Sequence, residues 1–202
     1  MKWDRLLAYG LVVCGVAYAS YSAISYYQKL DVVKEIDPTP KASAHASAQA
    51  KEKTNQNSWV IYSAKERPIK GEHFADLVIP RLKAQMPVIE GTDEDELAQG
   101  VGHYAGSVLP GEPDNAVLSG HRDTIFRKIG QLKPGDELHV KTSRGTFVYV
   151  IDKTWITHAD DRTVIVPHDQ PTLTLTTCYP FYYIGPAPKR YIIQSTLKER
   201  IH

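Results

Sequence analysis

The feature that most constrains this chain is an uncharged run close to its N-terminus. Between Arg5 and Lys29 lie twenty-three residues without a formal charge, residues 6–28. A helix that rises about 1.5 Å per residue would be roughly 34 Å long over this run, which is enough to cross the hydrocarbon core of a bilayer. Tyr26 and Tyr27 lie near its outer end, as aromatic rings often do at a membrane interface. The run therefore predicts a transmembrane anchor.

The charges that flank this run predict its orientation. Lys2 and Arg5 lie on the short side, which favours a cytoplasmic tail of residues 1–5 and a type II, single-pass protein of the cell membrane. A cleavable signal peptide is the alternative, because Ala17-Tyr18-Ala19 resembles a cleavage site. The uncharged run continues well past that point, which favours the anchor.

Composition divides the rest of the chain into a linker and a folded domain. From residue 37 to residue 57 the sequence is rich in Pro, Ala, Ser, Lys, Gln and Asn, with almost no large apolar side chains. Such a segment cannot bury enough surface to fold, so residues 29–58 are predicted to be an extracytoplasmic stalk. Residues 59–202 are then the folded domain, outside the cytoplasm. The net charge of +1 and the absence of a long basic run give no indication of a nucleic-acid partner.

The folded domain is predicted to be all-β. Short runs rich in β-branched and aromatic residues recur between turn residues, which is typical of a closed barrel or a sandwich. The candidate strands are residues 74–79, 86–89, 116–119, 137–142, 146–157, 163–166, 172–177 and 191–196. One short helix is expected at 93–99, capped by Thr92, with acids in its first turn and Gly100 at its end. Acids in a first helical turn usually match the helix dipole, so no metal site is expected there.

Cysteine usage singles out one thiol. Cys14 lies inside the predicted span, which leaves Cys178 alone in the exported part, without a partner for an intramolecular disulfide. A lone thiol outside the cytosol is exposed to oxidation, so a domain that keeps one is expected to use it. The alternative is a buried structural cysteine.

Two further residues stand where catalytic groups are commonly held. His121 follows the apolar run 116–119 and a glycine, and Arg190 begins the strand that follows Cys178. Strand ends that project into loops often carry catalytic groups. His103 could line a groove or simply pack. A thiol, an imidazole and a fixed cation are the parts that cysteine acyl transfer needs.

Three motifs in order resemble the sortases, membrane-anchored transpeptidases of Gram-positive bacteria. They are NAVLSGHRDT at 115–124, TLTLTTC at 172–178 and KRY at 189–191. The family's TLxTC signature is matched at residues 174–178, and the likeness extends over about residues 74–196. The segment from Cys178 to Arg190 is most similar to class D.

This resemblance implies both a fold and a set of roles. The fold would be a closed eight-stranded sortase-type β-barrel with short helices, after the N-terminal transmembrane helix. Cys178 would be the nucleophile, His121 the general acid and base, and Arg190 the stabiliser of the oxyanion or substrate. Thr177 would help to orient the scissile peptide. Val164, Val166 and His103 are the other candidates for the substrate groove.

The resemblance also implies the reaction and its partners. Sortases cleave an LPxTG-like sorting signal after its Thr, form a thioacyl intermediate and transfer the protein to an amine. The acceptor would be an amine of the peptidoglycan precursor, or a pilin lysine, which the end of the chain at His202 without a second span disfavours. No cofactor or metal is expected.

Two other functions remain open at this stage. One is a non-catalytic, wall-facing β-barrel binding module in which Cys178 is buried and inert. The other is a different cell-wall cysteine peptidase. L,D-Transpeptidases usually have Gly before the cysteine, whereas this chain has Thr177. NlpC/P60 enzymes place the cysteine before the histidine, whereas here His121 comes first.

Overall fold

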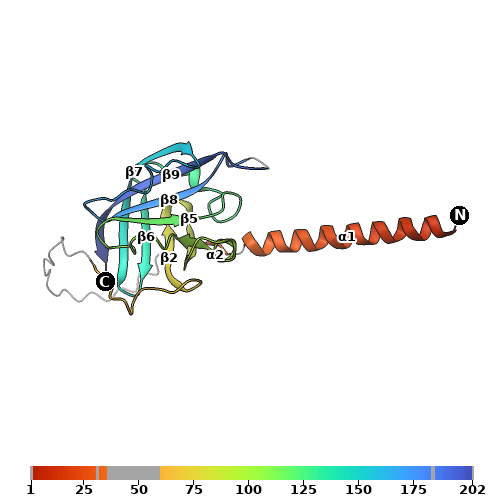
Figure 1. Cartoon of the computed structure of the whole chain (residues 1–202), viewed down its shortest axis with the longest axis horizontal. Helices are drawn as coiled ribbons and strands as arrows, with labels where there is room; N and C mark the ends of the chain where they lie inside the picture. Colours follow the sequence, from red (N-terminus) through yellow and green to blue (C-terminus); the bar gives the residue numbers. More distant parts are fainter. Residues whose placement is uncertain (1, 31, 36–59, 183–184, 202) are drawn as a thin grey trace, which may run out of the picture.

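A single long helix precedes a β-rich domain in the computed structural model, which describes residues 2–30, 32–35, 60–182 and 185–201 (Figure 1). Helix α1 (Lys2–Leu30) projects away from the strands, with its N-terminal end farthest from them. Its segment Ala8–Tyr27 is long and apolar enough to cross a membrane, and none of it is buried inside the protein. An apolar helix whose surface the rest of the described protein leaves uncovered fits a membrane anchor.

The β-domain is a barrel. Its strands are β2 (His73–Ile79), β3 (Ala84–Glu90), β4 (Val101–His103), β5 (Asn115–Ser119), β6 (Glu137–Thr142), β7 (Gly145–His158), β8 (Thr172–Tyr179) and β9 (Lys189–Ile201). They pair in the order β3-β2-β6-β7-β9-β8-β5-β4, and a parallel pairing between β4 and β3 closes the ring. The predicted closed eight-stranded barrel is therefore confirmed. Short helical segments lie between strands: η1 (Pro80–Leu82), α2 (Glu94–Gln99) and η2 (Ile129–Gln131).

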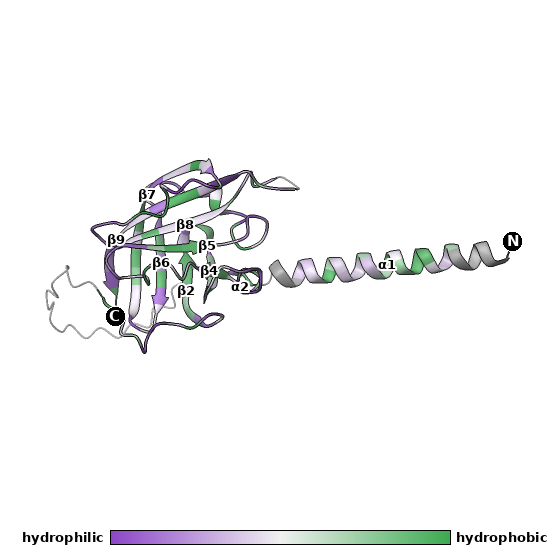
Figure 2. Cartoon of the chain, in the orientation of Figure 1, coloured by the Kyte–Doolittle hydropathy of each residue, from purple (hydrophilic) through white to green (hydrophobic). Residues whose placement is uncertain are grey.

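Alternation along the strands separates the core from the outer face. Figure 2 shows hydrophobic and hydrophilic residues mixed along the barrel strands. In β8, Leu173 and Leu175 belong to the core and are fully buried, as is Leu118 of β5. Burying a leucine stabilises a fold by about 1.5–3 kcal/mol, so this inward set fixes the register of each strand and, with it, the residues that face outward.

The local predictions were mostly confirmed, with three corrections. Residues 163–166 form a turn and not a strand, because they lie over the outer face of the sheet, where the Val164 carbonyl accepts a bond from Asn115 Nδ2 (3.4 Å). Strand β4 was missed, since three residues that include a glycine carry little β pattern. The cap of α2 is Asp93 and not Thr92: the Glu96 carboxylate accepts the Asp93 backbone N–H (3.1 Å) in a capping box.

The chain contacts the barrel directly after α1. Val32 and Val33 pack against the core, and the two-residue strand β1 (Lys34–Glu35) pairs with the start of β3, Lys34 opposite Gln85 and Glu35 opposite Ala84. The described part of the predicted stalk beyond α1 thus lies on the barrel. The remainder of that prediction, residues 36–58, lies outside the described residues.

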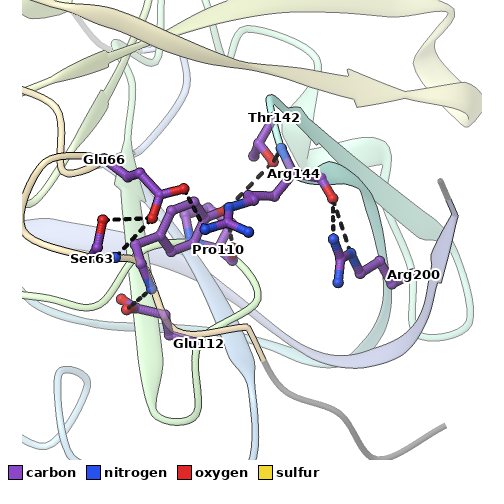
Figure 3. Close-up of polar contacts among 8 residues, drawn as sticks. Ser63, Glu66, Pro110, Glu112, Thr142, Arg144 and Arg200 are labelled. Atoms are coloured by element: carbon purple, nitrogen blue, oxygen red, sulfur yellow. Dashed lines mark hydrogen bonds and ion pairs between the residues drawn. The ribbon is translucent and has the colours of Figure 1, made fainter. Parts of the chain in front are cut away.

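A second attachment holds the segment that enters the barrel from residue 60. The Tyr62 backbone N–H donates to buried Glu112 (3.1 Å), and the Tyr62 hydroxyl donates to the Pro110 carbonyl (3.2 Å) (Figure 3). Glu66 forms an ion pair with Arg144, whose carbonyl accepts from Arg200 Nε (3.0 Å). Burial of the Tyr62 side chain raises its pKa, so the phenol stays neutral and can donate. This cluster ties residues 60–67 to the hairpin of β6 and β7 and to β9.

Candidate active site

Cys178 lies near the end of β8 on the outer face of the barrel. Side chains alternate along a strand, and Leu173 and Leu175 point into the core, so Thr174, Thr176 and Cys178 point outward. The thiol is half-buried and forms no disulfide. It is therefore open to a ligand while it remains supported by the sheet.

Arg190 is the direct partner of Cys178 across the antiparallel pair of β8 and β9. Residues in this relationship lie on the same face, with Cβ atoms roughly 4.5–5.5 Å apart. Arg190 Nη1 donates to the carbonyls of Ala187 (3.1 Å) and Lys189 (3.0 Å). Its Nε and Nη2 donate to no partner among the residues that the structure describes. The guanidinium is thus oriented by its own loop while part of its fork is available.

His121 reaches the opposite side of Cys178. Strands β5 and β8 run parallel, with Ser119 opposite Thr176, so His121 and Cys178 each come two residues after a matched pair. Ala116 and Leu118 belong to the core, so Ser119 faces outward at the end of β5, and the partly exposed His121 follows two residues later. Because β8 lies between β5 and β9, Cys178 has the segment that carries His121 on one side and Arg190 on the other.

The polypeptide around His121 is fixed by three backbone contacts. Gly120 N–H donates to the Thr176 carbonyl (3.2 Å), and the Gly120 carbonyl accepts from the Thr177 hydroxyl (2.6 Å). Phe126 N–H then donates to the His121 carbonyl (2.8 Å). A Cβ on Gly120 would lie 2.7 Å from the Phe126 ring, so the close packing at this corner requires glycine. The position of the imidazole is therefore set by β8 itself.

The imidazole also has an acidic neighbour. His121 Nε2 lies 3.7 Å from a Glu94 carboxylate oxygen at the start of α2. The His121 side chain is 32% exposed and Glu94 is more exposed still. An exposed pair of this kind contributes little to stability, about 0–1 kcal/mol.

Arg122 is a site residue that sequence reasoning missed. Its Nη1 donates to the Pro180 carbonyl and its Nη2 to the Gly185 carbonyl, both at 2.9 Å. One guanidinium therefore joins the segment after His121 to the loop between Cys178 and Arg190. Its one signal in the sequence is its position directly after the histidine, and that position alone does not predict contacts more than fifty residues away.

Aromatic rings hold the other side of the same loop. Tyr179, Phe181 and Tyr191 pack together, with the Phe181 ring 5.5 Å from the Tyr179 ring and 5.2 Å from the Tyr191 ring. Edge-to-face pairs at such separations are favourable. The loop after the thiol is anchored at both of its ends, although it contains several prolines and little regular structure.

The other predicted groove residues differ in burial and in position. Thr177 is 3% exposed and uses its hydroxyl on Gly120, so it supports the histidine corner. His103 is 2% exposed, with Nδ1 2.6 Å from Glu90, and its burial leaves almost no surface for a substrate. Val164 is 7% exposed and Val166 39%, in the turn over the outer face of the sheet that also carries Cys178.

The available chemistry is that of a nucleophilic thiol. Within the described parts of the chain, no group of three or more His, Cys, Asp or Glu side chains could hold a metal ion. A thiol flanked by an imidazole and a guanidinium can form a thioester and stabilise the oxyanion that precedes it.

Comparison with known proteins identifies the family. The family model described as the sortase domain matches residues 77–198, which include Cys178, His121 and Arg190. Sortase D of Bacillus subtilis (strain 168) is 43% identical over 190 residues, 93% of this chain and 93% of that protein. This chain belongs to the sortase family.

Solved structures agree with this assignment. The sortase resembles the SrtD catalytic domain of B. anthracis, with 44% identity and a TM-score of 0.56 over 77% of this chain and 96% of that one. It also resembles the Clostridium perfringens sortase D5 transpeptidase, with 30% identity and a TM-score of 0.60 over 68% of this chain and 89% of that one. The sortase-type barrel is confirmed, and the similarity to class D is supported by sequence and by structure.

Proposed function

We propose that this sortase is a membrane-anchored cysteine transpeptidase. It would cleave an LPxTG-like sorting signal after its Thr and transfer the protein to an amine of the cell-wall precursor. The observation that supports the proposal is that Cys178 is opposite Arg190 across β8 and β9, while His121 follows two residues after the end of β5, the other neighbour of β8. Three groups with these chemistries on one outer face are what thioacyl transfer requires.

In the first step, the Cys178 thiol gives its proton to His121, and the sulfur attacks the carbonyl carbon of the signal's Thr. The electron pair moves to the carbonyl oxygen, where the free N–H groups of Arg190 can donate to the developing oxyanion. When the intermediate collapses, the peptide C–N bond breaks and His121 gives a proton to the departing amine. The product is a thioester on Cys178.

In the second step, the acceptor amine attacks the thioester. His121, now neutral, takes a proton from the attacking nitrogen, and the C–S bond breaks to release the thiolate. Arg190 can again stabilise the oxyanion. Water competes with the amine for the thioester, so the balance between transfer and hydrolysis depends on how well the groove excludes water.

The proposed substrate groove is the outer face around β8. Val164 and Val166 lie in a turn over this face; exposed Val166 would supply an apolar contact for the Leu-Pro part of the signal, and buried Val164 would support the turn. Thr177 would act on the peptide indirectly, through the Gly120 carbonyl that it holds. A pilin lysine remains the second candidate for the acceptor.

The proposed location follows from α1. With Lys2 and Arg5 on the cytoplasmic side, the protein is a type II, single-pass protein of the cell membrane. The barrel then lies outside the cytoplasm, on the side where sorting signals and wall precursors meet.

The test uses the full chain in detergent micelles, a quenched LPxTG-type peptide and an amine acceptor, with products analysed by mass spectrometry. Wild type is expected to cleave after Thr and to yield the amine-linked product, whereas Cys178→Ala yields neither. If no acyl-enzyme forms with a panel of peptides that vary in the last two residues of the sorting signal, the transpeptidase proposal fails. The non-catalytic binding module is then the favoured function. Cleavage of muropeptides in place of sorting peptides would favour a different cell-wall cysteine peptidase.

A further inference from the structure

A cavity of about 240 Å³ lies on the barrel beside the outer end of α1. Val33 and Glu35, just beyond the helix, form part of its wall, and Leu82 and Lys83 form another part. The segment from Thr124 to Ile129 completes it. The volume is smaller than the roughly 300–1,000 Å³ of most small-molecule sites, so it fits a compact group.

The rim of this cavity is basic. Lys83, Arg127 and Lys128 all line it, whereas Glu35 is the one acid among its lining residues. All three cations are exposed, and none forms an ion pair with a residue that the structure describes. Three cations and one acid around one hollow leave an excess of positive charge, which favours an anionic ligand.

One contact sets the depth of the cavity relative to the membrane. Arg127 Nη1 donates to the hydroxyl of Tyr26, which belongs to the last turns of the apolar segment Ala8–Tyr27 (3.4 Å). Tyrosines at the end of a span usually lie at the level of the lipid headgroups. A cation that reaches Tyr26 therefore reaches the same level, where the ligand at hand is a phospholipid headgroup.

The backbone conformation of Lys83 also supports a ligand site here. Lys83 has φ 52°, the left-handed region, in which glycine is the residue of lowest cost. Its N–H donates to the Pro80 carbonyl (3.0 Å), which holds this conformation. A lysine at a position where glycine would cost less is expected to have a use for its side chain.

We propose that this cavity binds the headgroup of an anionic phospholipid, with Lys83, Arg127 and Lys128 around its phosphate and the apolar residues beneath it. The inference rests on the proposed membrane anchoring through α1. It also bears on the active site, because the segment that ends in the cavity begins at His121, whose carbonyl accepts from Phe126 N–H. A bound lipid would hold that segment at the membrane surface.

The experiment measures lipids retained by the full chain. Protein in detergent micelles is mixed with equal amounts of phosphatidylglycerol and phosphatidylcholine and examined by native mass spectrometry. We expect wild type to retain one phosphatidylglycerol per chain, at least about fivefold over phosphatidylcholine, a preference of the size that three charge contacts can give. The triple variant Lys83→Gln, Arg127→Gln, Lys128→Gln is expected to lose the preference.

Two controls separate this site from general attraction. Lys65→Gln, Lys141→Gln, Arg162→Gln removes the same number of exposed cations elsewhere and should keep the preference. Tyr26→Phe removes the hydrogen bond between α1 and Arg127 but leaves the three cations in place. This variant should also keep the preference for phosphatidylglycerol. If the triple variant does not fold, the single variants Arg127→Gln and Lys128→Gln are measured in its place. Each is expected to lower the preference for phosphatidylglycerol at least twofold.

Several results would overturn the proposal. They are equal retention of both lipids, equal loss in the control triple variant, displacement by millimolar glycerol phosphate, and a stronger preference for a polyprenyl diphosphate. A chain that fails to associate with bilayers refutes the anchor as well. A chain that associates with bilayers and transfers peptides, but shows no lipid preference, refutes only the headgroup site.

Discussion

Cys178 and Arg190 face each other as direct partners across β8 and β9. This relationship is unusually well determined, because both strands belong to the closed barrel and β9 is paired on its other side with β7, where Thr157 is opposite Arg190. The backbone of Arg190, paired on both sides, is therefore fixed relative to that of Cys178. Its guanidinium is oriented further by the bonds to the Ala187 and Lys189 carbonyls.

Replacing Arg190 should affect catalysis more than folding. Because the proposed donors to the oxyanion are lost, we expect Arg190→Ala to lower kcat about 10²-fold or more, with the unfolding midpoint little changed. Arg190→Lys keeps the charge but not the fork, and should recover only part of the rate. Lys189→Ala, the neighbouring cation on β9, is the matched control. Activity of Arg190→Ala within threefold of wild type would contradict the assignment.

Arg122 should act by positioning the loop after the thiol. Arg122→Ala removes both contacts to Pro180 and Gly185, and Arg122→Lys can replace only one of them. We expect faster hydrogen exchange in residues 179–182 and 185–189 and about a tenfold loss of kcat/KM in Arg122→Ala, with an intermediate result for the lysine variant. Exchange rates equal to those of wild type would show that the loop is held without it.

Thr177→Val tests the support of the histidine corner. The change keeps the shape but leaves the buried Gly120 carbonyl without the hydroxyl donor, which should cost about 1–3 kcal/mol in the free energy of unfolding. Urea denaturation of wild type and variant gives the difference. The control is Thr176→Val, a half-buried neighbour on the other face of β8. Equal stabilities for Thr177→Val and wild type would mean that the contact contributes nothing net.

The Asp161 carboxylate should make the stability of the loop after β7 sensitive to acid. Hydrogen bonds from Thr157 and Thr163 lower the pKa of this carboxyl from its ordinary 3.8 to about 2. A lowered pKa means that the contribution to stability is complete above pH 4 and is lost as the pH falls from about 4 towards 2. Asp161→Asn should therefore lose less stability than wild type over this range. Parallel stability curves for the two proteins down to pH 2 would rule the effect out.

Glu112 should be a major determinant of stability. This buried carboxylate accepts from Tyr62 N–H, from Leu109 N–H (2.9 Å) and from Arg67 Nη2 (2.7 Å). Glu112→Ala would leave those donors without their acceptor, at an expected cost of about 3–5 kcal/mol in the free energy of unfolding. Glu199→Ala, an exposed acid on β9, provides the comparison. A thermal midpoint for Glu112→Ala like that of Glu199→Ala would refute the claim.

The barrel could be predicted from sequence because inward and outward residues alternate along most of its strands. Where the pattern was short, prediction failed: β4 is three residues long, and residues 163–166 have β-branched side chains but pair with no strand of the closed barrel. The cap of α2 was misplaced by one residue, since both Thr92 and Asp93 are good capping residues and only the reach of Glu96 decides between them.

The candidate site also contains residues that could be predicted from sequence and residues that could not. Cys178, His121 and Arg190 could be named from motifs, and the neighbouring strand positions explain why those motifs recur together. Arg122 could not be named, because its contacts depend on how two loops approach each other. The burial of His103 was equally invisible, since its partner Glu90 belongs to a different strand and the pairing of β3 with β4 brings them together.

The pairing of β1 with β3 has a consequence for how far this enzyme can reach. Glu35 and Val60 both lie on the barrel, so residues 36–59 run from one point on the barrel to another. Under the proposed anchoring through α1, the height of the thiol above the membrane would be set by the few residues between α1 and β1, and not by the number of residues between β1 and Val60. A sorting signal would then have to reach the thiol close to the membrane surface.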